Sequence, residues 1–141
     1  MFTAKEIAYL NLQRVGRLAT VDSKGHPHVV PTGFRLDANN GTLQIGAADT
    51  PGRGQKRLYL THIRANPYFA FVIDDVVTQP QWAPRGVSVR GRAQIHPDGG
   101  QQLGPGFGPL WTEIVPESIS SWGLDTGTYD PPHFRKVAGN D

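Results

Sequence analysis

Short segments in which apolar and polar residues alternate recur along this chain and predict a fold built mainly of β-strands. Residues 87–96 alternate apolar or small side chains with polar ones, the pattern of a half-buried strand. Residues 68–74 form the most apolar stretch and predict a central strand, and residues 110–123 predict a last strand that bends at Pro116. The proline-containing segment 77–86 predicts a loop between the first two of these strands.

The first half of the chain predicts a meander of three strands. Residues 17–22, 28–37 and 42–48 are extended segments separated by turns that contain glycine, and the first two form a hairpin. Pro31 has no N–H group to donate to a neighbouring strand, so we expect it at a sheet edge or at a bulge.

Helical spacing is limited to two segments. Thr3 and Glu6 form a capping-box pattern that predicts a helix over residues 4–14, and a second helix is expected over residues 55–65. About six strands and two to three helices in this order suggest a small closed or split β-barrel with flanking helices. Residues 1–141 are then one domain, in which residues 124–141 are a lid against the body or a mobile tail.

Composition excludes several kinds of chemistry. The 141 residues contain no cysteine, which rules out thiolate nucleophiles, zinc–thiolate sites and iron–sulfur clusters. The formal net charge of +2 is too small to argue for nucleic-acid binding. No apolar run approaches the ~20 residues of a membrane span, and the N-terminus lacks the pattern of a signal peptide. A cytoplasmic protein without membrane or nucleic-acid partners is therefore expected.

Motifs for a metal centre or a catalytic nucleophile are also absent. The five histidines show no HxxxH or HExxH spacing, and no GxSxG motif occurs. The adjacent acids Asp74 and Asp75 follow an apolar strand and are expected in a solvated turn. The sequence therefore shows no motif for a thiolate, a metal centre or a hydrolase nucleophile.

Two segments have residue types that are able to bind an anion or a planar ring system. The sequence GRGQKR, residues 52–57, is a glycine-rich loop that enters a helix, where backbone N–H groups and nearby cations favour an anion. It is not a P-loop, and a basic loop in water is the alternative. In the segment 82–86, Trp82 and Arg85 are able to stack on a planar ring system or to fix the loop to the body. Arg90 and Arg92 add positive charge on one face of the next strand.

The order of these motifs resembles a known family. GRLATVDSKGHPHVVPTGFRLD is followed by GTLQIG, a basic loop with KR at a helix start, NPYFAFVIDD, W-x-PRGVSVRGRA and ISSWG. Over about residues 6–123 this series is similar to the pyridoxamine 5′-phosphate oxidase-like family. Within it, the chain resembles the actinobacterial branch of small deazaflavin-dependent oxidoreductases.

The resemblance implies a split β-barrel like that of FMN-binding proteins, which forms a homodimer with two cofactors in grooves at the interface. It implies FMN or the deazaflavin coenzyme F-420 as the cofactor, and no metal. In the family one strand lies along the ring system, one loop and helix start take the phosphate, and a segment of the partner chain approaches the ring. The corresponding cofactor-binding residues here are Val30, Pro31, Thr32 and Gly33; Thr50, Arg53, Lys56 and Arg57; and Trp82, Pro84 and Arg85.

Pro31 and Thr32 stand where a pyridoxamine-phosphate oxidase is expected to have a cation, which favours F-420 over FMN. The expected activity is the transfer of a hydride from the reduced cofactor to an electron-poor small-molecule acceptor. The proton comes from solvent or from His28, His62 or Tyr129, so no catalytic residue is assigned.

Three other readings stay open: an FMN oxidoreductase, a non-catalytic module that binds or stores the cofactor, and a nucleic-acid-binding barrel. The low net charge and the lack of aromatic residues among the basic positions of strand 87–94 argue against the last.

Overall fold

The computed structural model describes residues 1–50 and 57–137 and confirms a mainly β fold with a split-barrel architecture. Its elements, in chain order, are α1 (Ala4–Leu12), β1 (Val15–Val21), β2 (Pro27–Gly33), β3 (Arg35–Asp37), β4 (Thr42–Ala48), α2 (Leu58–Ala65), β5 (Tyr68–Val77), β6 (Ala83–His96), the short 3₁₀ helix η2 (Gly100–Leu103), β7 (Phe107–Trp122) and β8 (His133–Lys136).

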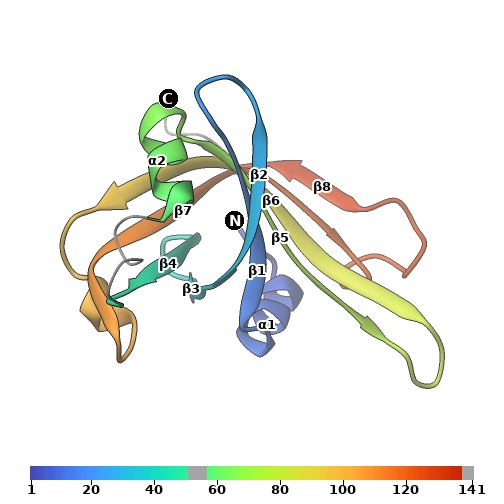
Figure 1. The fold of residues 1–141 in the computed structure, drawn as a ribbon. Coiled ribbons are helices and arrows are strands. Elements are labelled where there is room, and N and C mark those ends of the chain that lie inside the picture. Colours follow the sequence, from blue (N-terminus) through green and yellow to red (C-terminus); the bar gives the residue numbers. More distant parts are fainter. Residues whose placement is uncertain (51–56, 138–141) are drawn as a thin grey trace.

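All strands join one antiparallel sheet in the order β2-β1-β5-β6-β7-β4-β3, with β8 paired to β7. The two ends of this order, β2 and β3, are consecutive in the chain and are separated only by Phe34. The sheet therefore curls round so that its first and last strands meet at one corner (Figure 1). Phe34 packs edge-to-face on Phe71 of β5 at 5.8 Å between ring centroids, which fixes this corner to the core.

The core lies inside the curled sheet, and a helix lies at each end of it (Figure 1). Inward-facing side chains such as Leu18, Phe71, Val89 and Ile114 are almost completely buried. The capping box predicted at Thr3 is present: its hydroxyl accepts from the Glu6 N–H, and the Glu6 carboxylate accepts from the Thr3 N–H. This cap starts α1 where predicted, but the helix ends at Leu12 rather than at residue 14.

The loop predicted over residues 77–86 is present but shorter, since only residues 78–82 lie outside the strands. β6 begins at Ala83 and pairs with β5 as far as the Val77–Ala83 pair, so the hairpin is longer than the sequence pattern indicates. Arg85 and Asp75 face each other across this extension. This extension lies beyond the curled part of the sheet that surrounds the core (Figure 1). Its residues therefore form strands without alternating apolar and polar side chains.

Other boundaries also differ from the predictions. The expected single strand 28–37 is interrupted at the corner, and β8 adds a strand in the tail, so the described residues contain eight strands rather than about six. The predicted bend at Pro116 is present as a register shift opposite Gly91. A Cβ atom at Gly91 would overlap the Val115 carbonyl oxygen, so glycine permits this close approach. Pro31 lies on β2, an edge strand, as predicted.

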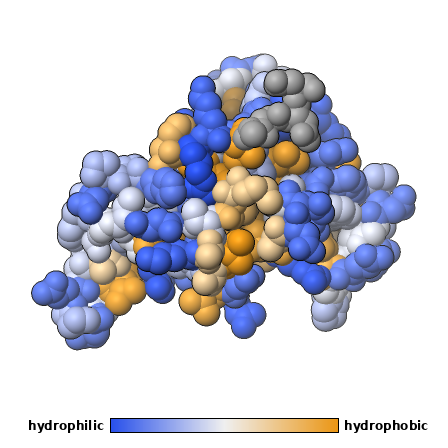
Figure 2. Space-filling view, turned by 180° about the vertical axis from the view of Figure 1, so that it is seen from behind, coloured by the Kyte–Doolittle hydropathy of each residue, from blue (hydrophilic) through white to orange (hydrophobic). Residues whose placement is uncertain are grey.

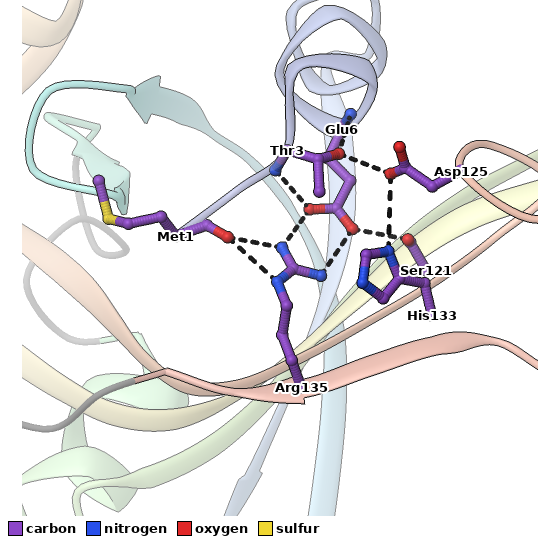
Figure 3. A network of polar contacts seen from close by, with 7 residues as sticks. All are labelled: Met1, Thr3, Glu6, Ser121, Asp125, His133 and Arg135. Atoms are coloured by element: carbon purple, nitrogen blue, oxygen red, sulfur yellow. Dashed lines mark hydrogen bonds and ion pairs between the residues drawn. The ribbon is translucent and has the colours of Figure 1, made fainter.

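A buried carboxylate links α1 to the C-terminal strand. The Glu6 side chain is completely buried, and Arg135 of β8 donates to both of its oxygens (Figure 3). Ser121 of β7 also donates to Glu6, at 2.6 Å, and the Thr3 N–H donates at 2.9 Å. Burial alone raises the pKa of Glu6, but the bonds from Arg135, Ser121 and Thr3 outweigh it and hold that pKa below its ordinary value.

Part of the apolar surface is not buried within this chain. Figure 2 shows hydrophobic surface running down the middle of one face, between hydrophilic flanks. The described residues with large exposed apolar side chains include Val15, Val29, Tyr68, Trp82 and Phe134. None of the described helices is long and apolar enough to cross a membrane.

Candidate functional site

A cavity of about 150 Å³ lies beside β2, β4 and the start of α2. Four of the residues expected to bind a cofactor line it: Pro31, Thr32, Gly33 and Arg57. The strand residues come from an edge of the sheet, because β1 is the one described strand that pairs with β2. The remaining wall consists of Gly46, Ala48, Tyr59 and Phe107.

Small residues on β4 make the room for this cavity. Leu43, Ile45 and Ala47 face the core, so Gln44, Gly46 and Ala48 alternate with them on the outer face. Gly46 has no side chain, and the ring of Phe107 lies against the space that a Cβ atom would occupy. Gly46 therefore lets the Phe107 ring lie against this strand, and the ring, Gly46 and Ala48 together line the cavity.

Two polar atoms at this cavity lack partners. Within residues 1–50 and 57–137, Thr32 Oγ1 and Arg57 Nε are buried and form no hydrogen bond. Buried polar groups are normally paired, and leaving one unpaired costs about 1–3 kcal/mol. A hydroxyl and a guanidinium are both donors, so together they suit an oxyanion such as a phosphate.

Other predicted residues on these segments lie elsewhere. Val30 alternates with Pro31 and packs against the core, and Thr50 is exposed beyond the end of β4. Neither lines the described cavity. Arg53 and Lys56 fall outside the described residues.

The third group of predicted residues is distant within one chain. Trp82, Pro84 and Arg85 belong to the far end of the β5–β6 hairpin, which extends away from β4 and α2 (Figure 1). Arg85 donates to both oxygens of Asp75, at 2.8 and 3.1 Å, and lies over the Tyr9 ring. The Arg85 hydrogen bonds hold the pKa of Asp75 below its ordinary value, although burial opposes this. Trp82 is 62% exposed.

Two further cavities follow along the outer face of β4, and sequence reasoning missed both. The next one, of about 250 Å³, is lined by Gln13, Arg14, Gly33, Phe34, Arg35, Gln44, Gly46, Leu103 and Phe107. The third, of about 510 Å³, extends past Arg35 and Gln44 to Gln102 and Trp111. The available signal was the small residues Gly46 and Ala48 on the polar face of a strand.

The candidate proton donors are not at these cavities. His62 is buried and shares a 2.9 Å hydrogen bond with Thr20, and the ring of His28 lies edge-on to it at 5.2 Å. Tyr129 is 77% exposed. None of the three lines the cavities described above.

One group of possible metal ligands occurs among the described residues, formed by Glu6, Asp125 and His133 (Figure 3). The Arg135 guanidinium already neutralises Glu6, and Asp125 accepts a 2.6 Å hydrogen bond from Thr3. Glu6 and Asp125 therefore already have partners within the protein, and these contacts hold the C-terminal tail against the body.

The sequence is similar to one protein family and to a reductase of known activity. The family profile of pyridoxamine 5′-phosphate oxidase matches residues 2–121. A 5a,11a-dehydrotetracycline/5a,11a-dehydrooxytetracycline reductase of Streptomyces rimosus is 37% identical over 140 residues, which cover 99% of this chain and 96% of that protein.

Solved structures have the same fold. A conserved hypothetical protein of Mycobacterium tuberculosis superimposes with a TM-score of 0.65 at 20% identity, over 99% of this chain and 94% of that one. An F-420 reductase superimposes with a TM-score of 0.63 at 26% identity, over 85% of this chain and 98% of that one.

Proposed function

Because this chain belongs to the pyridoxamine 5′-phosphate oxidase family, we propose that it is an oxidoreductase that works with a bound flavin-type cofactor. The cofactor is F-420, with FMN as the alternative, and the acceptor is an electron-poor organic molecule. When bound, the cofactor supplies a hydride, so the protein needs no nucleophile or metal of its own.

The observation that carries this proposal is the pair of unpartnered atoms at the β2–β4 cavity. Thr32 and Arg57 come from segments far apart in the sequence and line one cavity, where each has a buried polar atom without a protein partner among the described residues. A cofactor phosphate supplies acceptors for both. Pro31 and Gly33 add little bulk along the same wall, which suits the close approach of a flat ring.

The remaining residues of the proposed site have supporting roles. Lys56 and Arg53 would add positive charge for the phosphate, and Val30 and Thr50 would support the strand and loop. No carboxylate lines the cavity among the described residues, so its charge favours an anion. The protein's part in the reaction is then to hold the cofactor, orient the acceptor and exclude water.

The acceptor class is proposed from the name of the similar reductase of Streptomyces rimosus. That protein is a reductase of 5a,11a-dehydrotetracycline, and the 37% identity extends over almost the whole of both chains. We infer that the acceptor here is also a conjugated carbonyl compound with several fused rings. The similar structures include an F-420 reductase and FAD-binding proteins, so they support a flavin-type cofactor, and the preference for F-420 rests on Pro31 and Thr32.

We propose that the working unit is a homodimer. The β2–β4 cavity holds about 150 Å³, which is smaller than the ~300–1,000 Å³ of a typical ligand pocket, so further walls are needed. The outer face of β1, β5 and β6 offers a contact surface, since Ala19, Ala70, Val72 and Ser88 are half-buried and alternate with core residues such as Leu18, Phe71 and Val87. A partner on this face would bring a second β5–β6 hairpin, with Trp82, Pro84 and Arg85.

A charge on this face tests the dimer. We expect Val72→Glu to convert a dimer into a monomer and to weaken cofactor binding at least tenfold, because the new carboxylate is desolvated in the contact and its neighbour across the sheet, Arg17, is already paired with Asp74. Sedimentation velocity measures the first effect and fluorescence titration the second. Thr61→Glu, on the exposed side of α2, is the control and should change neither the oligomeric state nor the affinity for the cofactor. A Val72→Glu protein that stays dimeric would place the interface elsewhere.

Direct titration tests the function. The purified chain is titrated with F-420 and with FMN while cofactor fluorescence is followed, and we expect F-420 to bind with a Kd below about 10 μM and FMN more weakly. Reduced F-420 is then mixed with an enone or quinone, and its oxidation is followed by absorbance. Weaker binding than about 100 μM for both cofactors contradicts the proposal. Tight binding without turnover favours the non-catalytic module.

A further inference from the structure

The cavity of about 250 Å³ beside Phe34 is lined by two arginines, and it lies next to the cavity assigned to the cofactor. It shares Gly33, Gly46 and Phe107 with the cavity assigned to the cofactor, so the two are neighbours on the outer face of β4. We propose that it binds the hydride acceptor, that this acceptor is a planar organic anion, and that Arg14 and Arg35 recognise its negative charge. The inference rests on the proposed function, because the cofactor occupies the adjoining cavity.

Charge is the first argument. Arg14 and Arg35 both line this cavity, whereas no Asp or Glu is among its described lining residues. Several arginines elsewhere are already engaged: Arg17 pairs with Asp74, Arg85 with Asp75 and Arg135 with Glu6. In the described part of the chain, Arg14 and Arg35 form no ion pair, and Arg35 has one long bond of 3.4 Å to the Gln102 carbonyl oxygen. Asp37 is the acid nearest to Arg35 in the chain and lines the adjoining third cavity, but it forms no ion pair with Arg35, so both guanidinium groups remain available to an oxyanion.

Shape is the second argument. Phe34, Leu103 and Phe107 give the cavity apolar walls, which favour a flat ring system. Phe34 is held by its edge-to-face contact with Phe71, and Phe107 lies against Gly46, so both rings have fixed partners. Gln13 and Gln44 add neutral hydrogen-bonding groups at the same site. This combination suits fused rings that carry an ionised enol, phenol or acidic group at one edge.

The position supports an acceptor rather than a second, unrelated ligand. The cavity continues from the cofactor wall at Gly33 toward Arg35 and Gln44, which also line the third and largest cavity. A fused-ring molecule is therefore able to place one end beside the cofactor and the other in the wider space near Trp111. The two arginines lie along this path, so they would orient the molecule as well as attract it.

The test uses anthraquinone-2-sulfonate, a planar electron-poor anion, and 2-(hydroxymethyl)anthraquinone as its neutral match. Binding to the full chain without cofactor is measured by isothermal titration calorimetry. We expect Arg14→Gln and Arg35→Gln each to weaken sulfonate binding about 5- to 20-fold, a range that allows for solvent screening at these exposed side chains. The neutral compound should bind these variants and the wild type equally. Arg64→Gln, on the exposed side of α2, is the matched control and should change neither affinity.

Titration of the same variants with F-420 and FMN separates this inference from the proposed function. Unchanged cofactor affinity in Arg14→Gln and Arg35→Gln supports an acceptor site distinct from the cofactor site. An equal loss of F-420 and sulfonate affinity overturns the inference, because the cavity then belongs to the cofactor. A sulfonate affinity that is unchanged by both substitutions overturns the inference as well. A wild-type chain that binds neither cofactor overturns the proposed function instead.

Discussion

Replacing Arg57 by alanine is expected to weaken F-420 binding by about 10- to 150-fold, because a hydrogen bond to a charged group contributes roughly 1.5–3 kcal/mol. Arg57 lines the β2–β4 cavity, and its Nε atom is buried without a partner among the described residues. Its loss removes a cation from the proposed phosphate site while breaking no described hydrogen bond. The free energy of unfolding should therefore change much less than the affinity.

Arg64→Ala is the control for this prediction. Arg64 lies on the exposed side of α2, so its substitution removes the same charge from the same helix without touching the cavity. Thr32→Val removes only the buried hydroxyl and should weaken binding about fivefold. Fluorescence titration with F-420 measures all three variants. Equal affinities of the Arg57→Ala and Arg64→Ala proteins would show that the phosphate binds elsewhere.

Replacing Arg135 by alanine is expected to lower the free energy of unfolding by about 3–5 kcal/mol, the usual effect of removing one partner of a buried ion pair. Glu6 is completely buried and would keep only the bonds from Ser121 and Thr3. The neighbouring Lys136→Ala is the control, since Lys136 is exposed on the same strand. Urea unfolding at fixed protein concentration, followed by tryptophan fluorescence, measures both variants. Equal effects would mean that Arg135 does not stabilise Glu6.

The same pair predicts a pH dependence. The native pKa of Glu6 is held below its ordinary value, so the stability it contributes is present above the unfolded pKa and is lost as the pH falls through the native pKa. In the Arg135→Ala variant the hydrogen bonds from Arg135 are lost, so burial raises the pKa of Glu6. The difference in unfolding free energy between wild type and variant should therefore begin to narrow as the pH falls through the raised pKa of the variant, above the ordinary value of about 4.3, and should narrow further as the pH falls through the lowered pKa of the wild type. A difference that stays constant with pH would assign the effect to lost packing.

Local signals predicted local structure well. Thr3 and Glu6 predicted the helix start, because a capping box involves only neighbouring backbone and side-chain groups. The strand over residues 42–48 has the predicted bounds, and Pro31 lies at a sheet edge because proline cannot pair on both sides. The extension of β5 and β6 was missed, since strands without a core face show no alternation of apolar residues.

The candidate site depends on contacts that no local pattern contains. Pro31 and Arg57 belong to separate segments, and only the resemblance to a family brought them into one prediction. The placement of Arg14 and Arg35 at the second cavity was not predicted, because this cavity is lined by residues of separate segments, among them Phe34 and Leu103. The small residues on the outer face of β4 were the one visible sign, and such residues are also common on exposed strands.

The pairing of Glu6 with Arg135 also has a consequence for the order of events during synthesis. The two residues are separated by 129 positions, so α1 and the first strands are synthesised well before the Arg135 guanidinium is added. Until then the nascent protein carries a carboxylate that cannot be desolvated without cost. The N-terminal helix is therefore expected to dock last, after β8, although it is made first.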